Sequence, residues 1–397
     1  MPVDLIKSIT VVECATFVTG PYATALLADL GARVIKIESP PTGDPYRYFA
    51  PDPHYSFNFA HLNRNKESLA LDLKSPEGKD ICLDVVKKAD VFVENFRPGT
   101  ADRLGLGYDA LGAVNPKLVY CSISAFGQSG PCAEKPGFDT LGQAMSGLLS
   151  LLSDPDDPKV MGMAVSDYVT GLSAGFGILG ALLARQQSGV GCRLDTSLLQ
   201  ATLSFIGESA AGYLRAGNVP NRMARVKNAH AFAFVCKDNL PLAIHCSVPE
   251  KFWLALLQAV ERTDLATEEK FRSRDARREN YEALEQTLAP LFKLRSRDEW
   301  LRRLEANDVP AAPLYTIAEA MADPQVSHLQ LIEELEHPVA GKMRLVGPPV
   351  RYDNQPRQPS LPPPLVGEHS TAILRELGKS DAAIRRLQEQ KIIGSRE

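Results

Sequence analysis

The amino-acid sequence predicts an α/β protein with a large domain, built on a parallel sheet with helices on its faces, and a smaller α+β domain. Two observations predict this class. Over the first 125 residues, apolar strand-like runs alternate with helix-like runs. Farther along, no glycine occurs between Gly217 and Gly341. The alternation is typical of parallel sheets, and the change in composition indicates a second domain.

The alternation begins with an apolar run at 9–18, which we expect to form a strand. A turn follows at Thr19-Gly20-Pro21, before a helical stretch at 22–31 and a second strand at 32–39. The same order then repeats, with strands expected at 68–73, 90–95 and 118–124 and a helix at 76–89. We therefore expect β-turn-α-β units that pair in parallel.

The remaining chain divides by composition into a second domain and a returning segment. Residues 137–191 are rich in Gly and Ala, which allows a helix to approach its neighbours closely. The glycine-free stretch holds an expected strand pair at 231–246, turning at Asp238-Asn239, and a charged helix at 273–292. A Pro-rich extended segment at 347–370 and a final helix at 370–378 follow. The predicted domains are 1–195 and 326–397 for the large domain, 225–325 for the small domain, and 196–224 for a linker.

Charge and cysteine usage limit the function classes. The net charge of −4, with both signs spread along the chain, argues against nucleic-acid or anionic-membrane partners and favours a small molecule or a second copy. Seven scattered cysteines without a C-x-x-C spacing predict reduced thiols, no disulfide and no metal site. We see no secretory signal and no uncharged apolar run approaching the roughly 18 residues of a membrane span, so we expect a cytoplasmic protein.

The first β-turn-α-β unit, with Glu38 at the end of its second strand, resembles a dinucleotide-binding fold. A nicotinamide dehydrogenase is therefore one candidate. Its glycine pattern is missing, because Gly20 stands alone and Pro21 and Tyr22 occupy positions where the backbone would approach a pyrophosphate. The chain also lacks H-E-x-x-H and P-loop motifs. The dehydrogenase stays a distant alternative.

Two carboxylates, Asp139 and Asp167, stand at the expected starts of small-residue helices. One interpretation is capping, in which Asp167 is the N-cap of the helix that follows and stabilises it by about 0.5 to 2 kcal/mol. The other is catalysis, because a carboxylate at a helix N-terminus can act as a nucleophile whose developing oxyanions meet N–H donors. The local residues permit both.

The whole chain resembles the family III CoA-transferases, the group of formyl-CoA transferase, carnitine CoA-transferase and the bile-acid-inducible transferases. The segments that carry this resemblance are 11–47, 62–79, 89–111, 115–131, GFDTLGQAMSG at 137–147, VSDYVTG at 165–171 and 365–378. The resemblance implies a large Rossmann-like domain formed by the N- and C-terminal segments, a smaller inserted domain, and an interlocked homodimer.

The resemblance also implies the chemistry. Asp167 falls on the family's nucleophile, which forms a mixed anhydride and then an aspartyl-CoA thioester, and Asp139 joins it as the second catalytic carboxylate. Coenzyme A is then a substrate, and no tightly bound cofactor is expected. The implied CoA contacts are Val18, Thr19, Ser39, Leu71, Asp72, Leu73, Lys74, Asn95, Phe96, Arg97, Arg103, Pro136, Gly137 and Phe138.

Two departures bear on the substrate. Formyl-CoA transferases have a Gln where this chain has Val18, and a glycine-rich loop in the small domain, which here has no glycine. These departures argue against oxalate and formate as the substrate pair. The expected reaction uses a succinyl-CoA-type donor and a dicarboxylic or hydroxy acid acceptor, because cationic residues such as Arg47 could hold a second carboxylate. The alternative is an α-methylacyl-CoA racemase of the same fold. Its proton-carrying His is replaced here by Phe138.

Overall fold

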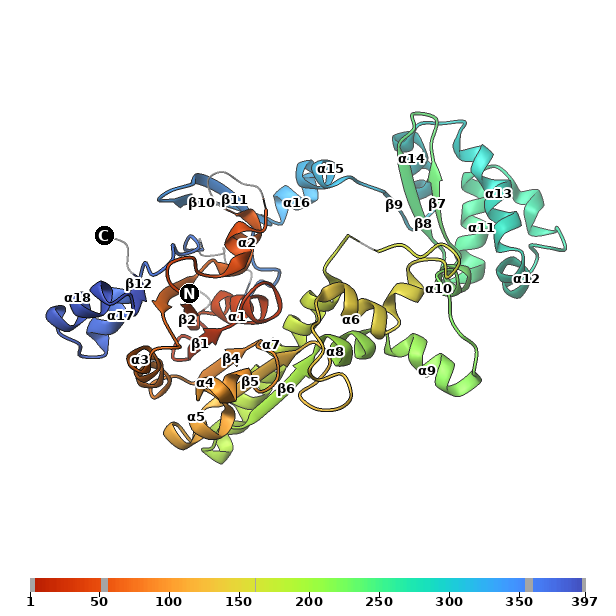
Figure 1. The fold of residues 1–397 in the computed structure, drawn as a ribbon. Helices are drawn as coiled ribbons and strands as arrows, with labels where there is room; N and C mark the ends of the chain where they lie inside the picture. Colours follow the sequence, from red (N-terminus) through yellow and green to blue (C-terminus); the bar gives the residue numbers. More distant parts are fainter. Residues whose placement is uncertain (1–3, 51–55, 161, 354–359, 395–397) are drawn as a thin grey trace. The chain divides into compact units, whose positions relative to one another are not determined.

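The computed structural model describes residues 4–50, 56–160, 162–353 and 360–394. The chain divides into two compact units (Figure 1). The first contains residues 1–149, 160–210 and 330–397, and the second contains residues 150–159 and 211–329. The segment 196–224, which the sequence analysis treats as a linker, holds helices α8 (Leu198–Phe205) and α9 (Gly207–Ala216).

The first unit is built on a seven-stranded sheet in the order β12-β3-β2-β1-β4-β5-β6. Its strands are β1 (Thr10–Cys14), β2 (Arg33–Glu38), β3 (Lys66–Leu71), β4 (Val91–Glu94), β5 (Val119–Ser124), β6 (Arg193–Ser197) and β12 (Ile393–Gly394). Neighbouring strands from β3 to β6 pair in parallel, and β12 is antiparallel to β3. The predicted α/β class is confirmed. From β1 the chain adds β2 and β3 on one side, and then adds β4, β5 and β6 on the other side. The strand order therefore reverses between β1 and β4.

Helices cover both faces of this sheet because its strands alternate apolar side chains between the two sides. Val12 belongs to a core shared with α3 (Pro76–Val86), α5 (Tyr108–Val114), α17 (Ser370–Glu376) and α18 (Asp381–Glu389). Its neighbour Val11 packs on the opposite face with α1 (Thr19–Asp29) and α7 (Val165–Ser188). Shorter helices in this unit are α2 (Phe57–Asn63), α4 (Thr100–Leu104) and α6 (Asp139–Met145).

Small residues let α7 lie against its neighbours, as expected. A Cβ atom added at Gly171 would lie 2.9 Å from the carbonyl oxygen of Thr19 in α1. A Cβ at Gly142 in α6 would lie 2.7 Å from Cβ of Leu198. The glycines therefore bring α1, α6, α7 and α8 closer than larger residues would permit.

The expectation about apolar runs is wrong for α7. Residues 168–184 carry no charge, and α7 is long and apolar enough, by length and composition, to span a membrane. Its inner stripe, with Ala174, Ile178 and Leu182, nevertheless packs in the core of the parallel sheet. This packing makes α7 a core helix of the first unit.

The second unit has a three-stranded antiparallel sheet, β7 (Ala231–Val235), β8 (Pro241–His245) and β9 (Ala311–Pro313), which includes the predicted strand pair. The predicted helix at 273–292 is two helices, α12 (Arg274–Glu279) and α13 (Tyr281–Phe292), separated at Asn280. The other helices are α10 (Ala224–Ala229), α11 (Pro249–Ala259), α14 (Arg297–Ala306), α15 (Ile317–Ala322) and α16 (Pro324–His328).

The C-terminal segment returns to the first unit. It forms the hairpin β10 (Ile332–His337) and β11 (Gly341–Val346), the expected helix α17, and then α18 and β12, so α17 is not the final helix. Part of the expected extended segment, 354–359, lies outside the described residues. The described parts, 347–353 and 360–369, contain neither helix nor strand.

Candidate active site

The candidate CoA-binding residues share one edge of the parallel sheet. Each group follows the carboxyl end of a strand: Val18 and Thr19 after β1, Ser39 after β2, Leu71 to Lys74 at the end of β3, Asn95 to Arg97 and Arg103 after β4, and Pro136 to Phe138 after β5. Open α/β sheets bind ligands at this edge, where the strand order reverses. In this sheet the reversal lies between β1 and β4.

Asn95 fixes the turn at that reversal. Its Oδ1 accepts the backbone N–H of Thr16 at 3.0 Å, and its Nδ2 donates to the Thr16 carbonyl oxygen at 2.8 Å and to Thr19 Oγ1 at 3.1 Å. Asn95 therefore holds the end of β4 against the turn that leads from β1 into α1. Its side chain is occupied in shaping this edge.

The other candidates differ in what they offer a ligand. Lys74, Arg97 and Arg103 are exposed cations, so their charges can meet phosphates. The side chains of Val18 and Leu71 lie in the protein interior and are not accessible to a ligand. Thr19 is buried on the same edge. The remaining candidates are more accessible: Ser39, Pro136 and Phe138 are exposed, and Asp72, Leu73, Phe96 and Gly137 are half-buried.

Asp139 and Asp167 meet although 28 residues separate them. Asp139 is the first residue of α6, and Asp167 is the third of α7. The backbone N–H of Asp167 donates to Asp139 Oδ1 at 3.1 Å. The prediction that Asp167 could cap its own helix is wrong, because the N-cap position of α7 is Ala164, which has no side-chain oxygen. Asp139 caps the helix from α6 instead.

The surroundings of Asp167 change its acidity. Burial, and then the negative charge of Asp139, raise the pKa of the Asp167 carboxyl to about 7. At neutral pH the group is therefore only partly ionised, and its ionised form is more basic than an ordinary carboxylate. A perturbed carboxylate at a helix N-terminus is the arrangement expected of a nucleophile or base.

A cluster of aromatic rings lies at the same edge of the sheet, in segments that follow β1, β2 and β5. The ring of Phe17 lies 5.8 Å from Tyr46, 6.4 Å from Phe49 and 6.1 Å from Phe138, measured between ring centroids. Phe17 adopts a φ of 61°, in the left-handed region that a bulky residue rarely occupies. Burial, and then the charges of Tyr168 and Asp167, raise the pKa of Tyr46 to about 12, so the cluster lies within electrostatic range of the candidate nucleophile.

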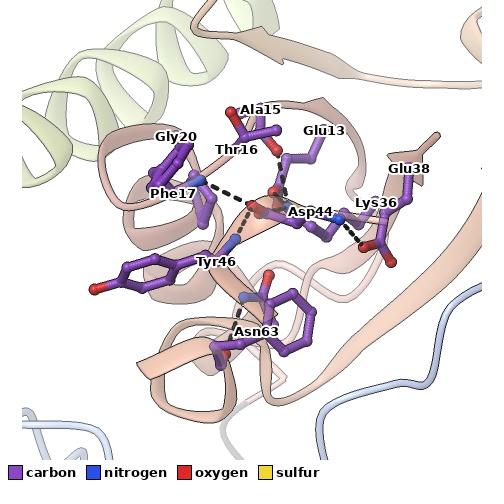
Figure 2. Close-up of polar contacts among 12 residues, drawn as sticks. Glu13, Ala15, Thr16, Phe17, Gly20, Lys36, Glu38, Asp44, Tyr46 and Asn63 are labelled. Carbon is purple, nitrogen blue, oxygen red and sulfur yellow. Dashed lines mark hydrogen bonds and ion pairs between the residues drawn. The ribbon is translucent and has the colours of Figure 1, made fainter. Parts of the chain in front are cut away.

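A buried ion network holds Phe17 in this conformation (Figure 2). Asp44 Oδ1 accepts the backbone N–H groups of Phe17 at 3.2 Å and Tyr46 at 2.9 Å. Its Oδ2 lies 2.9 Å from Lys36 Nζ, which in turn lies 2.6 Å from Glu13 Oε1. One carboxylate thus links the turn after β1 to the turn after β2.

Lys66 extends the same network from β3. Its Nζ lies 2.8 Å from Glu13 Oε2. Burial would raise the pKa of Glu13, but the two ammonium groups lower it to about 2, whereas burial lowers the pKa of Lys66 to about 8. Three adjacent strands are therefore joined by charges inside the protein.

The expected role of Arg47 is wrong. Its guanidinium binds Glu38 through Nε at 2.9 Å and Nη2 at 2.7 Å, donates to the Pro364 carbonyl oxygen, and lies 3.7 Å from the centre of the Phe59 ring. Because Glu38 and Arg47 are buried together, Arg47 is not free to hold a substrate carboxylate. For the same reason Glu38 cannot bind a ribose, which removes the remaining support for a dehydrogenase.

Sequence reasoning missed Phe17, Asp44, Tyr46 and Gln143 as residues of this region. Asp44 and Tyr46 lie within the segment 11–47 that carries the family resemblance, so their positions could have been noticed. Their contacts with Phe17 depend on the fold. Among the described residues, no group of three or more His, Cys, Asp or Glu side chains could hold a metal ion.

Comparisons with known proteins extend over almost the whole chain. Residues 6–370 match the family described as CoA-transferase family III. The human succinyl-CoA:glutarate CoA-transferase is 32% identical over 401 residues, covering 99% of this chain and 90% of the relative. The acetyl-CoA:oxalate CoA-transferase of Acetobacter aceti is 35% identical over 383 residues, covering 94% and 95%. A crystal structure of a CAIB/BAIF family protein from Brucella suis matches with a TM-score of 0.82 and 34% identity, covering 93% and 98%.

Proposed function

The chain belongs to CoA-transferase family III and is an enzyme of that class, and on this premise we propose that Asp167 is its nucleophile. The substrates are an acyl-CoA thioester and a small carboxylic acid. The observation that carries the proposal is the position of Asp167. Its half-buried carboxylate stands in the first turn of α7, at the ligand-binding edge of the sheet, with a pKa raised to about 7.

The reaction has four acyl transfers. The Asp167 carboxylate attacks the thioester carbonyl, the C–S bond breaks, and CoA thiolate leaves an acyl-aspartyl anhydride. The thiolate then attacks the aspartyl carbonyl, which releases the donor acid and leaves an aspartyl-CoA thioester. The acceptor carboxylate repeats the two steps in reverse, giving its own CoA thioester and regenerating Asp167. Each step is easier than a direct exchange between two acids.

The environment of Asp167 supports these steps. A more basic carboxylate is a better nucleophile, provided that it is ionised, and a pKa near 7 satisfies both requirements at neutral pH. The N-terminus of α7 also presents positive potential to developing oxyanions.

Exposed cations support CoA as the common substrate. Lys74, Arg97 and Arg103 follow β3 and β4 on the edge that carries Asp139, and each can pair with a phosphate of the nucleotide. The aromatic cluster of Phe17, Tyr46, Phe49 and Phe138 offers an apolar surface to the pantetheine arm or to the acyl group.

The acids are proposed from the names of the relatives. Those names specify succinyl-CoA with glutarate, and acetyl-CoA with oxalate. We propose a succinyl-CoA-type donor and a dicarboxylic or hydroxy acid acceptor in the cytoplasm. The second carboxylate of such an acid would require a cation other than Arg47, because Arg47 is ion-paired with Glu38.

We also propose a homodimer. In the isolated chain α7 and α8 expose large apolar side chains, with Phe176 82%, Leu183 62% and Phe205 64% exposed. A second copy that covers these side chains would remove an apolar surface unusual for a soluble monomer. Sedimentation velocity at micromolar concentration should give about twice the monomer mass, and a monomer would contradict this proposal.

The nucleophile is tested by trapping the intermediate. Incubation with succinyl-CoA without an acceptor should add CoA, as a thioester, to the peptide that contains Asp167, and hydroxylamine should remove it. Asp167→Asn should form no adduct and lose exchange of CoA between acids. Asp109→Asn, an exposed carboxylate in α5, should behave as the unmodified protein.

Other outcomes would identify other functions. Exchange of an α-proton into solvent without an adduct would indicate a racemase, a reaction for which Phe138 supplies no proton-carrying group. Full CoA exchange by Asp167→Asn would show that another residue is the nucleophile.

A further inference from the structure

Gln143 is a buried amide that contacts Asp139, one of the two candidate catalytic carboxylates. Its side chain is 1% exposed. Its Nε2 donates to Asp139 Oδ2 at 2.6 Å and to the carbonyl oxygen of Met163 at 2.9 Å. Because both partners only accept hydrogen bonds, the amide has one consistent orientation, with both N–H groups used.

These two bonds join the starts of two helices. Asp139 is the first residue of α6, one turn before Gln143, and Met163 lies two residues before α7 begins. The Gln143 side chain therefore ties the segment entering α7 to α6. The N-cap of α7 provides no side-chain oxygen, so this tie and the bond from Asp167 to Asp139 contribute to holding the first turn of α7 against α6.

The two oxygens of Asp139 consequently have different partners. Oδ2 receives Gln143, and Oδ1 receives the backbone N–H of Asp167. A carboxylate held at both oxygens cannot rotate about its Cβ–Cγ bond without losing a hydrogen bond. Its charge is therefore kept at a fixed place beside the Asp167 carboxylate.

We propose that Gln143 is a positioning residue for the reaction, which sets the placement of the Asp139 charge against the nucleophile Asp167. This rests on the proposed function, in which Asp167 attacks the thioester. Gln143 itself touches neither CoA nor the acid. It acts through Asp139, whose charge makes Asp167 more basic, and through Met163, which fixes the first turn of α7.

The proposal has a defined sign in pH. The charge of Asp139 is, after burial, the cause that raises the pKa of Asp167 to about 7. Only the ionised Asp167 attacks, so the rate falls as pH drops through that value. Releasing Asp139 from Gln143 weakens the repulsion and lowers the pKa of Asp167, and the acid limb of the profile should move to lower pH. The plateau rate should fall as well, because the less basic and less fixed carboxylate attacks more slowly.

The experiment measures single-turnover formation of the aspartyl-CoA adduct from succinyl-CoA between pH 5 and 9. Gln143→Leu should lower the midpoint of the acid limb by roughly half a unit to one unit and reduce the plateau rate about tenfold. Gln187→Leu, on the exposed last turn of α7, is the matched control and should match the unmodified protein. Gln143→Met, which keeps the unbranched length of the side chain, replaces Gln143→Leu if that variant does not fold.

A double-mutant cycle tests the route through Asp139. Asp139→Asn should lower the midpoint at least as much as Gln143→Leu, and the combined variant should show no further shift beyond Asp139→Asn alone. The proposal would be overturned if Gln143→Leu reduced the plateau rate without moving the midpoint. It would also be overturned if Gln143→Leu shifted the midpoint equally in the unmodified protein and in Asp139→Asn. Failure of the proposed function is distinguishable, because Asp167→Asn would then still form the adduct.

Discussion

Lys36 Nζ lies 2.6 Å from Glu13 Oε1, and both side chains are fully buried at directly paired positions of β1 and β2. Asp44 shares the same ammonium group, and through it the turn that carries Phe17 is connected to the sheet. A buried ion pair adds little stability compared with apolar residues, but the loss of one partner is costly because it leaves the other charge unpaired. The network therefore makes the shape of the site depend on each charge.

Replacing Lys36 should destabilise the first unit strongly. Lys36→Met removes the positive charge between Glu13 and Asp44 and is expected to cost about 3 to 5 kcal/mol, observed as a lower midpoint in thermal unfolding. Lys342→Met is the control, because the pair of Lys342 with Glu334 is exposed and should be worth about 1 kcal/mol or less. Equal losses in the two variants would contradict the role of the buried network.

Gly171 should not accept a side chain. In Gly171→Ala the new methyl group would meet the Thr19 carbonyl oxygen at 2.9 Å and Tyr22 Cδ1 at 3.0 Å, so α7 must move away from α1. We expect a loss of about 1 to 3 kcal/mol in unfolding free energy and a lower kcat, since Asp167 moves with its helix. Gly112→Ala in α5, where a Cβ meets nothing within 4 Å, should be neutral or stabilising by up to about 1 kcal/mol. A destabilised Gly112→Ala with a tolerated Gly171→Ala would refute this account.

Lys74 should contribute to CoA affinity and not to the chemical step. Lys74→Ala is expected to raise the KM for the acyl-CoA about five- to thirtyfold, with kcat nearly unchanged. The reason is that Lys74 binds the phosphate equally well in the ground state and in the transition state. The effect should shrink as salt is added. Lys117→Ala, an exposed lysine just before β5 at the opposite edge of the sheet, should leave KM unchanged. A fall in kcat with unchanged KM would exclude simple phosphate binding.

In the parallel sheet, the strands that the sequence predicts correctly are those buried on both faces. Continuous apolar runs at 9–18 and 118–124 became β1 and β5, because a covered parallel strand requires such residues on both sides. The edge strand β6 was missed because its sequence, RLDTS, is largely polar and only partly buried. The two-residue β12 leaves no periodic pattern at all.

The candidate site was predictable residue by residue, but its contacts were not. The family resemblance identifies Asp167, yet the bond from its N–H to Asp139 crosses 28 residues and depends on how α6 packs on α7. Arg47 shows the opposite error. Its charge suggested a substrate contact, and only the fold reveals that its guanidinium is paired with Glu38, nine residues earlier.

The antiparallel pairing of β12 with β3 has a consequence for biosynthesis. β3 ends at Leu71, but the residues that cover its free edge are translated much later: Gly367, His369 and Ser370 bond to Ser68 and Ala70, and Ile393 pairs with Leu71. While the ribosome makes the intervening chain, β3 presents unpaired backbone groups that could associate with other nascent chains. The nascent protein should therefore depend on chaperones until residues 365–394 emerge. Removal of this segment should cause aggregation, even though the residues around Asp167 are still present in the truncated chain.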